Sequence, residues 1–152
     1  MNIEGVITLT IMVLSFYLYY KNEKESQEKI AKKETIDFHK KQYKPIAPDD
    51  RLPIISKNVY ELKDIALTAT EMVYESPLPS EEEVNSLVKG DFVKLKFLDK
   101  SGEVERMWVE YLRKEDDLHL GILRNDSFDD SELSYGKHIY FHSNHLFILE
   151  KS

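Results

Sequence analysis

IEGVITLTIMVLSFYLYYKNEKESQEKIAKK, residues 3–33, decides how this chain is organised. Residues 3–20 carry one charged side chain, Glu4, and the residues that follow are mainly lysine and glutamate. A helix over 3–20 is about 27 Å long, close to the thickness of the hydrocarbon layer of a membrane. Tyr19 and Tyr20 lie with other aromatic residues at one end, where such side chains favour the headgroup region. The stretch therefore predicts a transmembrane anchor.

Two other interpretations of residues 3–20 fit less well. A cleaved secretory signal needs a positively charged start and a small-x-small cleavage site, whereas this segment has Glu4 and ends in the bulky SFYLYY. A core helix of a soluble protein needs a polar face, which the segment lacks. Five lysines from Lys21 to Lys33 follow the segment and none precedes it. The positive-inside rule therefore predicts a single-pass cell-membrane protein with its N-terminus outside and residues 21–152 in the cytoplasm.

A polar connector follows the anchor. Residues 21–44 hold eight lysines against five acidic residues, with pairs such as Glu25 and Lys29 at helical spacing, which indicates a polar helix. This helix is either a solvated stalk whose lysines set the topology or a patch for anionic lipid, and the interleaved acids favour the stalk. KPIAPDDRLP, residues 44–53, holds three prolines, which end the helix and predict a stiff linker. The predicted organisation is an anchor over 1–20, a basic helical stalk with its linker over 21–53, and an acidic domain over 54–152.

The domain is predicted to begin with two helices. Residues 56–76 place apolar side chains on one face at helical spacing: Val59, Leu62, Ala66, Ala69 and Val73. Ser80 followed by Glu83 is a capping-box signature, which opens a short helix that Gly90 closes.

After Gly90 the apolar period changes from 3.6 to 2, which indicates strands. Four successive segments are predicted to point the following residues inward: Val93, Leu95 and Phe97; Met107, Val109 and Tyr111; Leu118, Leu120 and Ile122; Ile139 and Phe141. LFILE, residues 146–150, is predicted as a last strand. The outer face carries Trp108, Leu123 and Tyr140, and the helix over 56–76 is expected to cover part of it. The predicted fold class is α+β: a transmembrane helix and a polar stalk helix, then a helix packed on a small antiparallel four- or five-stranded sheet or partly open barrel.

Charge and composition exclude several classes of function. Residues 45–152 hold 13 Lys and Arg against 22 acidic residues, a net charge of −9, so binding to nucleic acid is not expected. The chain has no cysteine, which excludes disulfides, thiol nucleophiles and thiolate metal sites. The sequence contains no Gly-rich phosphate loop, no Ser-His-Asp spacing and no metalloprotease motif. No enzyme activity, cofactor or metal site is predicted.

Four landmarks follow one another in the second half of the chain: the strand start at Gly90–Asp91, GEVERMWVEYL (102–112), GILRND (121–126) and YGKHIYFHSNHLFIL (135–149). In this order they resemble the YegJ-like family of uncharacterised small bacterial domains, over about residues 87–149. The resemblance implies an α+β domain with no assigned catalytic residues. It also implies a candidate role as an immunity protein, which protects a bacterium from a toxin. The anchor and helical lead-in are additions to the short soluble form of that family.

Histidines are the first candidates for chemistry. His138 and His142 lie four residues apart on one strand, roughly 13 Å, too far to share one metal ion. His142 and His145 flank a short break and could converge, with His119 on a neighbouring strand. The alternative is that these are outward polar residues and a turn histidine whose hydrogen bonds are satisfied.

Arg106, Trp108 and Glu110 share the outward face of one strand. A tryptophan beside an arginine and an acid is typical of a binding hot spot, although burial under the helix would equally explain Trp108. The predicted partner surface combines these with acidic loop residues: Arg106, Trp108, Glu110, Asp126, Asp129 and Asp130.

The sequence thus favours a membrane-anchored, cytoplasmic protein-binding module, with an immunity role as its specific form. A basic protein is the expected partner, because an acidic domain attracts it electrostatically. The alternatives are a membrane-tethered enzyme that uses His and Asp or Glu, and an accessory subunit of a membrane complex. No oligomeric state is predicted.

Overall fold

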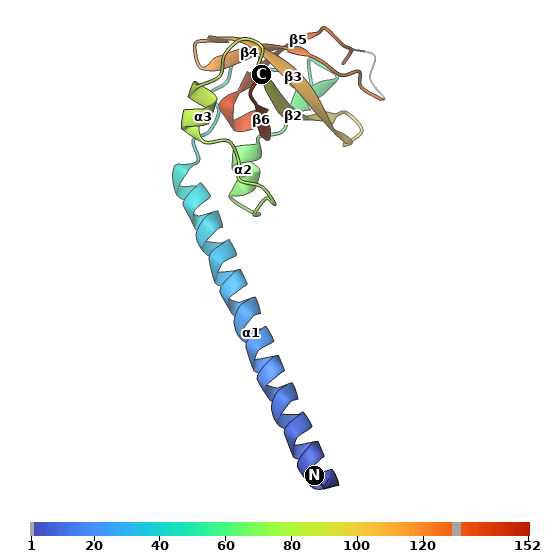
Figure 1. Cartoon of the computed structure of the whole chain (residues 1–152). Helices are drawn as coiled ribbons and strands as arrows, with labels where there is room; N and C mark the ends of the chain where they lie inside the picture. Colours follow the sequence, from blue (N-terminus) through green and yellow to red (C-terminus); the bar gives the residue numbers. More distant parts are fainter. Residues whose placement is uncertain (1, 129–131) are drawn as a thin grey trace.

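The computed structural model describes residues 2–128 and 132–152. Figure 1 shows one long helix, α1 (Ile3–Gln42), that projects from a small β-rich domain. Its 40 residues are about 60 Å long at about 1.5 Å per residue. Asn2 caps the helix by accepting a hydrogen bond from the Gly5 N–H at 2.9 Å. The predicted anchor and the predicted polar helix are therefore one continuous helix, and none of its residues is buried.

The helix ends where the proline-rich linker begins, as predicted. Tyr43 is its C-cap, and the Tyr43 hydroxyl donates to the Asp64 carboxylate at 2.9 Å. The Asn144 side chain donates to the Lys44 carbonyl, also at 2.9 Å. These two hydrogen bonds attach the end of α1 to the domain.

The helix predicted over residues 56–76 is wrong. Tyr60–Leu62 forms strand β1, which pairs with the end of β2 (Phe92–Asp99), and a helix, α2, covers Ile65–Ala69. Buried residues alternate in β1, the period of a strand, and lie four apart in α2, one helical turn. Asp64 separates the two elements because its side chain caps the first turn of α2. The local pattern of this segment also fits a longer helix, but part of the segment pairs with the edge of β2 as a strand.

The capping box predicted at Ser80 is confirmed. The Ser80 hydroxyl accepts from the Glu83 N–H at 3.2 Å, and the Glu83 carboxylate accepts from the Ser80 N–H at 2.7 Å, at the start of α3 (Glu81–Asn85). Gly90 does not close this helix, which ends earlier in the chain. Gly90 has a φ of +97°, a conformation that favours glycine, and turns the chain into β2.

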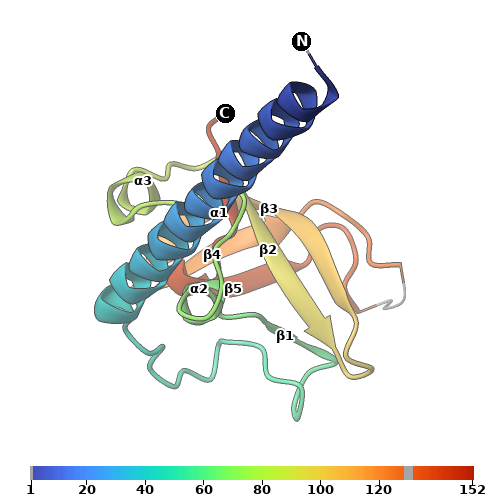
Figure 2. The same ribbon diagram turned by 90° about the horizontal axis from the view of Figure 1, so that it is seen from below.

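The strands form one antiparallel meander in the order β1-β2-β3-β4-β5, which a last strand, β6, nearly closes by pairing with β2. The remaining elements are β3 (Val104–Glu115), β4 (Leu118–Leu123), β5 (His138–His142), the 3-10 turn η1 (Ser143–His145) and β6 (Ile148–Glu150). Figure 2 shows the strongly curved sheet with α1 running across it in that view. The predicted α+β fold with a partly open barrel is confirmed.

The inner side of the barrel is the hydrophobic core. The predicted inward residues of β2, β3 and β5 are all buried: Val93, Leu95 and Phe97; Met107, Val109 and Tyr111; Ile139 and Phe141. These strands alternate with a strict period of 2, so each core residue faces the others across the barrel.

The side chains of β4 that face the core are not the ones predicted to do so. Leu123, predicted outside, is fully buried in the core opposite Val109, and Ile122, predicted inside, is only half-buried. A bulge in β3 between Tyr111 and Arg113 shifts the register of this pair of strands. At Gly121 a Cβ would collide with the Val109 side chain and the Glu110 carbonyl, so glycine is required on the inner face. Its neighbours Leu118 and Leu120 face outward and are nevertheless buried.

A buried carboxylate, Asp91, fixes the end of the chain beside the start of β2. Asp91 is 1% exposed and accepts hydrogen bonds from the Val88 N–H at 2.9 Å, the Lys151 ammonium at 2.9 Å and the Ser152 N–H at 3.1 Å. Burial opposes its ionisation, but these donors lower the pKa of Asp91 to about 2. The contact supports the pairing of β6 with β2, which nearly closes the barrel.

Candidate binding surfaces

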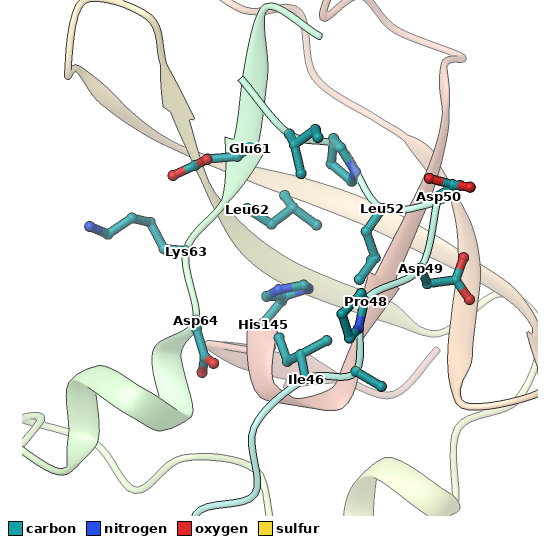
Figure 3. Close-up of a pocket in the computed structure, with 13 residues that line it drawn as sticks. Ile46, Pro48, Asp49, Asp50, Leu52, Glu61, Leu62, Lys63, Asp64 and His145 are labelled. Atoms are coloured by element: carbon teal, nitrogen blue, oxygen red, sulfur yellow. The ribbon is translucent and has the colours of Figure 1, made fainter. Parts of the chain in front are cut away.

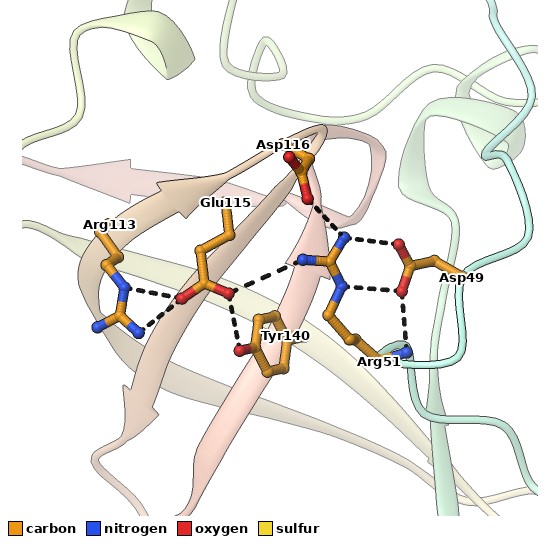
Figure 4. A network of polar contacts seen from close by, with 6 residues as sticks. All are labelled: Asp49, Arg51, Arg113, Glu115, Asp116 and Tyr140. Atoms are coloured by element: carbon orange, nitrogen blue, oxygen red, sulfur yellow. Dashed lines mark hydrogen bonds and ion pairs between the residues drawn. The ribbon is translucent and has the colours of Figure 1, made fainter.

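The linker is bound to the domain through Arg51. Its guanidinium donates to both carboxylate oxygens of Asp49, at 3.0 and 2.7 Å (Figure 4). The guanidinium lies 3.8 Å from Glu115, at the end of β3, and 3.3 Å from Asp116, in the β3–β4 turn. It also lies over the Tyr140 ring, at 5.6 Å from the ring centre. We call Asp49, Arg51, Glu115, Asp116 and Tyr140 the strap face, because the linker crosses the outside of the barrel there.

The acids of the strap face are held ionised by their partners. Hydrogen bonds from Arg51 lower the pKa of Asp49 to about 2. The Tyr140 hydroxyl, 2.8 Å away, and Arg113 lower the pKa of Glu115. The linker, predicted as a stiff connector, is therefore packed on the barrel beside β4 and β5, where the covering helix was expected.

A hollow of about 640 Å³ lies between the linker and β1 (Figure 3). The linker contributes Ile46, Pro48 and Leu52 to one wall, and Leu62 and His145 lie opposite. Four carboxylates and one ammonium also line this hollow: Asp49, Asp50, Glu61, Asp64 and Lys63. An apolar base with an acidic rim suits the aliphatic stem and charged end of a lysine or arginine.

A second hollow, of about 1050 Å³, lies where α1 meets the domain. The end of α1 supplies Phe38 and Tyr43, and the loop before α3 supplies Val73 and Pro77. Ser143 of η1 lines its domain side. The hollow is therefore a junction between the stalk and the barrel.

His142 and His145 converge, as the sequence allowed, but through backbone hydrogen bonds. His145 Nδ1 accepts from the His142 N–H at 3.0 Å, and His142 Nδ1 accepts from the Asn144 N–H at 3.1 Å. Both imidazoles must have an unprotonated Nδ1 to accept, so they shape the η1 turn in their neutral form. Burial, with a smaller electrostatic contribution from His142, lowers the pKa of His145 to about 3. Within residues 2–128 and 132–152, no three His, Cys, Asp or Glu side chains group as metal ligands would.

His119 lies on the inner face of β4 and is 2% exposed. Its Nε2 is 3.0 Å from the Ser143 hydroxyl, and its Nδ1 has no hydrogen-bond partner among the described residues. Burial, and then electrostatic interactions with Lys114 and His142, lower the pKa of His119 to about 4. An imidazole this weakly basic, whose Nδ1 has no partner among the described residues, is a poor general base for Ser143. The Phe141 ring stacks on it at 5.3 Å, as expected for a core histidine.

The predicted partner surface is brought together only in part. Arg106, Trp108 and Glu110 do share the outer face of β3, where Glu110 pairs with Arg124 at 2.7 Å. Trp108 is half-buried. Asp126 is exposed and accepts from the Tyr135 N–H at 2.7 Å, so it shapes its own loop. The predicted residues Asp129 and Asp130 lie outside the described residues.

Sequence reasoning missed the side chains that surround Trp108. Lys94 Nζ lies 4.5 Å from the centre of its ring, and Phe92 packs edge-on at 6.5 Å. The alternation in FVKLKFLD signalled that Phe92, Lys94 and Lys96 point outward. The Lys96 ammonium lies 4.2 Å from the centre of the Phe147 ring. Phe147 comes from the segment before β6, and no alternation in the sequence predicted that it would lie beside these residues.

Comparisons of the chain with family models, with curated proteins and with solved structures found no match. The resemblance to YegJ-like domains therefore stays a prediction.

Proposed function

We propose that this chain is a single-span membrane protein that presents a small protein-binding domain at the cytoplasmic surface. The observation that supports the anchor is that the apolar half of α1 has no protein cover. Its large side chains are exposed on every side, for example Met12 at 64% and Phe16 at 73%. By length and composition α1 can cross a membrane. Contiguous apolar surface of this extent needs an apolar environment, which a bilayer supplies.

The lysines after the span support the orientation. Lys21 follows Tyr20 directly and Lys24 comes three residues later, and lysines beside a span favour its cytoplasmic side. Residues 21–42 continue the helix for roughly 33 Å beyond the span, which holds the domain clear of the headgroups. From there the domain can reach other proteins at the membrane.

The net charge of −9 on residues 45–152 supports a basic partner. The linker hollow is lined by four acidic residues against one lysine, which supports its binding a lysine or arginine side chain of that partner. Neutralisation of a toxin, the role that the family resemblance implies, is the specific form of this proposal.

Single-cysteine labelling tests the anchor and its orientation, because the chain has no native cysteine. Asn2→Cys and Lys100→Cys would each be expressed in intact bacterial cells and treated with a membrane-impermeant maleimide. We expect labelling at position 2 and none at position 100 until the membrane is permeabilised. Labelling at position 100 in intact cells, or a chain that fractionates with soluble protein, contradicts the proposal.

Photo-crosslinking in membranes tests the binding function. A photoreactive amino acid at Asp50, whose side chain is 99% exposed, should crosslink the full-length chain to a protein partner. Raising the ionic strength from about 50 to about 300 mM should reduce this adduct, because salt screens attraction between exposed charges. The same group at Lys100, in the β2–β3 turn, is the matched control. An adduct at Asp50 that salt does not change argues against a basic partner.

A further inference from the structure

Three cations stand side by side on the outer face of the barrel. Lys94 and Lys96 of β2 lie opposite Trp108 and Arg106 of β3 in the strand register. Phe147 joins them from the neighbouring segment, because its N–H donates to the Lys94 carbonyl at 3.0 Å. We call Lys94, Lys96, Arg106, Trp108 and Phe147 the cation–aromatic patch.

Aromatic rings position the cations of the patch. The Lys94 ammonium lies 4.5 Å from the centre of the Trp108 ring. The Lys96 ammonium and the Arg106 guanidinium lie 4.2 and 5.7 Å from the centre of the Phe147 ring. Contacts with ring faces orient a cation but leave its charge uncompensated. Each cation therefore keeps its capacity to bind a carboxylate.

No carboxylate of the described residues forms an ion pair with the patch. Of the ten other Lys and Arg residues over 45–152, five have acidic partners: Arg51, Lys57, Arg113, Arg124 and Lys151. The patch stays unpaired although acidic residues outnumber Lys and Arg by 22 to 13 over residues 45–152. Burial, and then the charges of Arg106 and Lys63, lower the pKa of Lys96. The cations of the patch therefore repel one another, and no ion pair within the described residues offsets this repulsion.

We propose that the cation–aromatic patch binds an acidic segment of a partner protein. Asp or Glu carboxylates of the segment would accept from Lys96 and Arg106, and an apolar side chain would pack against the exposed part of Trp108. This surface is separate from the acidic rim of the linker hollow and has the opposite sign. The inference goes beyond the proposed function, and the membrane span enters it only in the choice of a protein segment over lipid.

A protein segment fits better than a membrane or a nucleic acid. The stalk places the domain roughly 33 Å beyond the span, so the patch stands away from lipid headgroups. A long polyanion that tracks across the domain would meet its net charge of −9, whereas a short segment meets only the local cations. Tryptophan and arginine together are also typical of the centres of protein interfaces.

The fluorescence of Trp108 tests the proposal directly, because the chain contains one tryptophan. The full-length chain, in micelles of an uncharged detergent, would be titrated with a short synthetic peptide of Asp, Glu and Leu. We expect a saturable change in emission, and no change with the matched peptide of Asn, Gln and Leu. The double variant K96Q/R106Q should weaken binding about tenfold or more, because it removes two charge-assisted contacts.

The control is K89Q/K100Q, which removes the same charge from two exposed lysines outside the patch. Unchanged far-UV circular dichroism and melting of both variants would show that each folds. Equal weakening in the control, or no emission change with the acidic peptide, overturns the proposal. Tighter binding to phosphatidylserine vesicles or to single-stranded DNA than to the peptide also overturns it. A chain that failed the membrane labelling test would leave these outcomes unaffected.

Discussion

The strap face and the cation–aromatic patch place arginines in opposite electrostatic settings on one barrel. On the strap face, Arg51 contacts three carboxylates, and the linker it carries is fixed to the β3–β4 turn. On the patch, Arg106 is exposed and contacts the Phe147 ring without an acidic partner in the described residues. A cation that already has its counterions joins two parts of the fold. A cation that lacks them is available to a ligand.

Acidification should have the largest effect on stability. It should destabilise the strap-face side of the barrel before the side that carries the cation–aromatic patch. The folded-state pKa values of His119, about 4, and His145, about 3, lie below the ordinary value near 6.5. The unfolded chain therefore binds more protons, and stability that is complete above pH 6.5 is lost as the pH falls through 4. His119 alone should lower the free energy of unfolding by about 3 kcal/mol over that range.

Hydrogen exchange at pH 7 and pH 4.5 is the measurement. Amides of η1 and the linker, which His142 and His145 support, should lose protection before those of β2 and β3. His138→Gln, at an exposed histidine, is the control and should leave the pH dependence unchanged. A uniform loss of protection over the domain would show that the two surfaces do not differ.

Gly121→Ala should weaken both surfaces together, because the inner face of β4 supports each of them. The added methyl group would meet the Val109 side chain and the Glu110 carbonyl, and backbone cannot yield as a flexible side chain does. We expect a loss of about 1–3 kcal/mol in the free energy of unfolding, measured by denaturant titration. Gly102→Ala, where a Cβ meets nothing, is a strained but uncrowded control. If Gly121→Ala were neutral, the inverted facing of β4 would be wrong.

Sequence periodicity reveals a strand when one face is buried, and β2, β3 and β5 could be predicted for that reason. β4 could not, because the bulge near Tyr111 changes its register and both its faces are buried. β1 was hidden because its formation depends on the edge of β2, more than 30 residues later in the chain.

The same distinction applies to the candidate sites. Alternation along β3 placed Arg106 and Trp108 on one face, and these are two of the five residues of the cation–aromatic patch. The strap face joins Arg51 to Glu115 and Asp116, which are far away in the sequence, and nothing local relates them. A hydrogen-bond network between distant segments follows from the packed fold and cannot be predicted from spacing.

Arg51→Met should release the linker with little effect on the barrel. Methionine keeps much of the packing of the side chain but removes its contacts with Asp49, Asp116 and Glu115. We expect roughly fivefold faster exchange of the amides of residues 46–54, while the amides of β2 and β3 keep their rates. Arg113→Met is the matched control, because it removes one contact with Glu115 without touching the linker. An unchanged linker in Arg51→Met would mean that its apolar contacts alone hold it.

Arg106→Gln should have the smallest effect on folding, and that small effect is informative. Removing the contacts of Arg51 breaks favourable ion pairs, whereas removing the charge of Arg106 relieves repulsion on Lys96. The free energy of unfolding should therefore stay within about 0.5 kcal/mol of the parent, with a gain rather than a loss. Raising the salt concentration should erase any gain, because screening weakens the repulsion in the parent as well. A clear loss of stability that salt does not alter would mean that Arg106 serves the fold through Phe147, and the contrast with Arg51 would then fail.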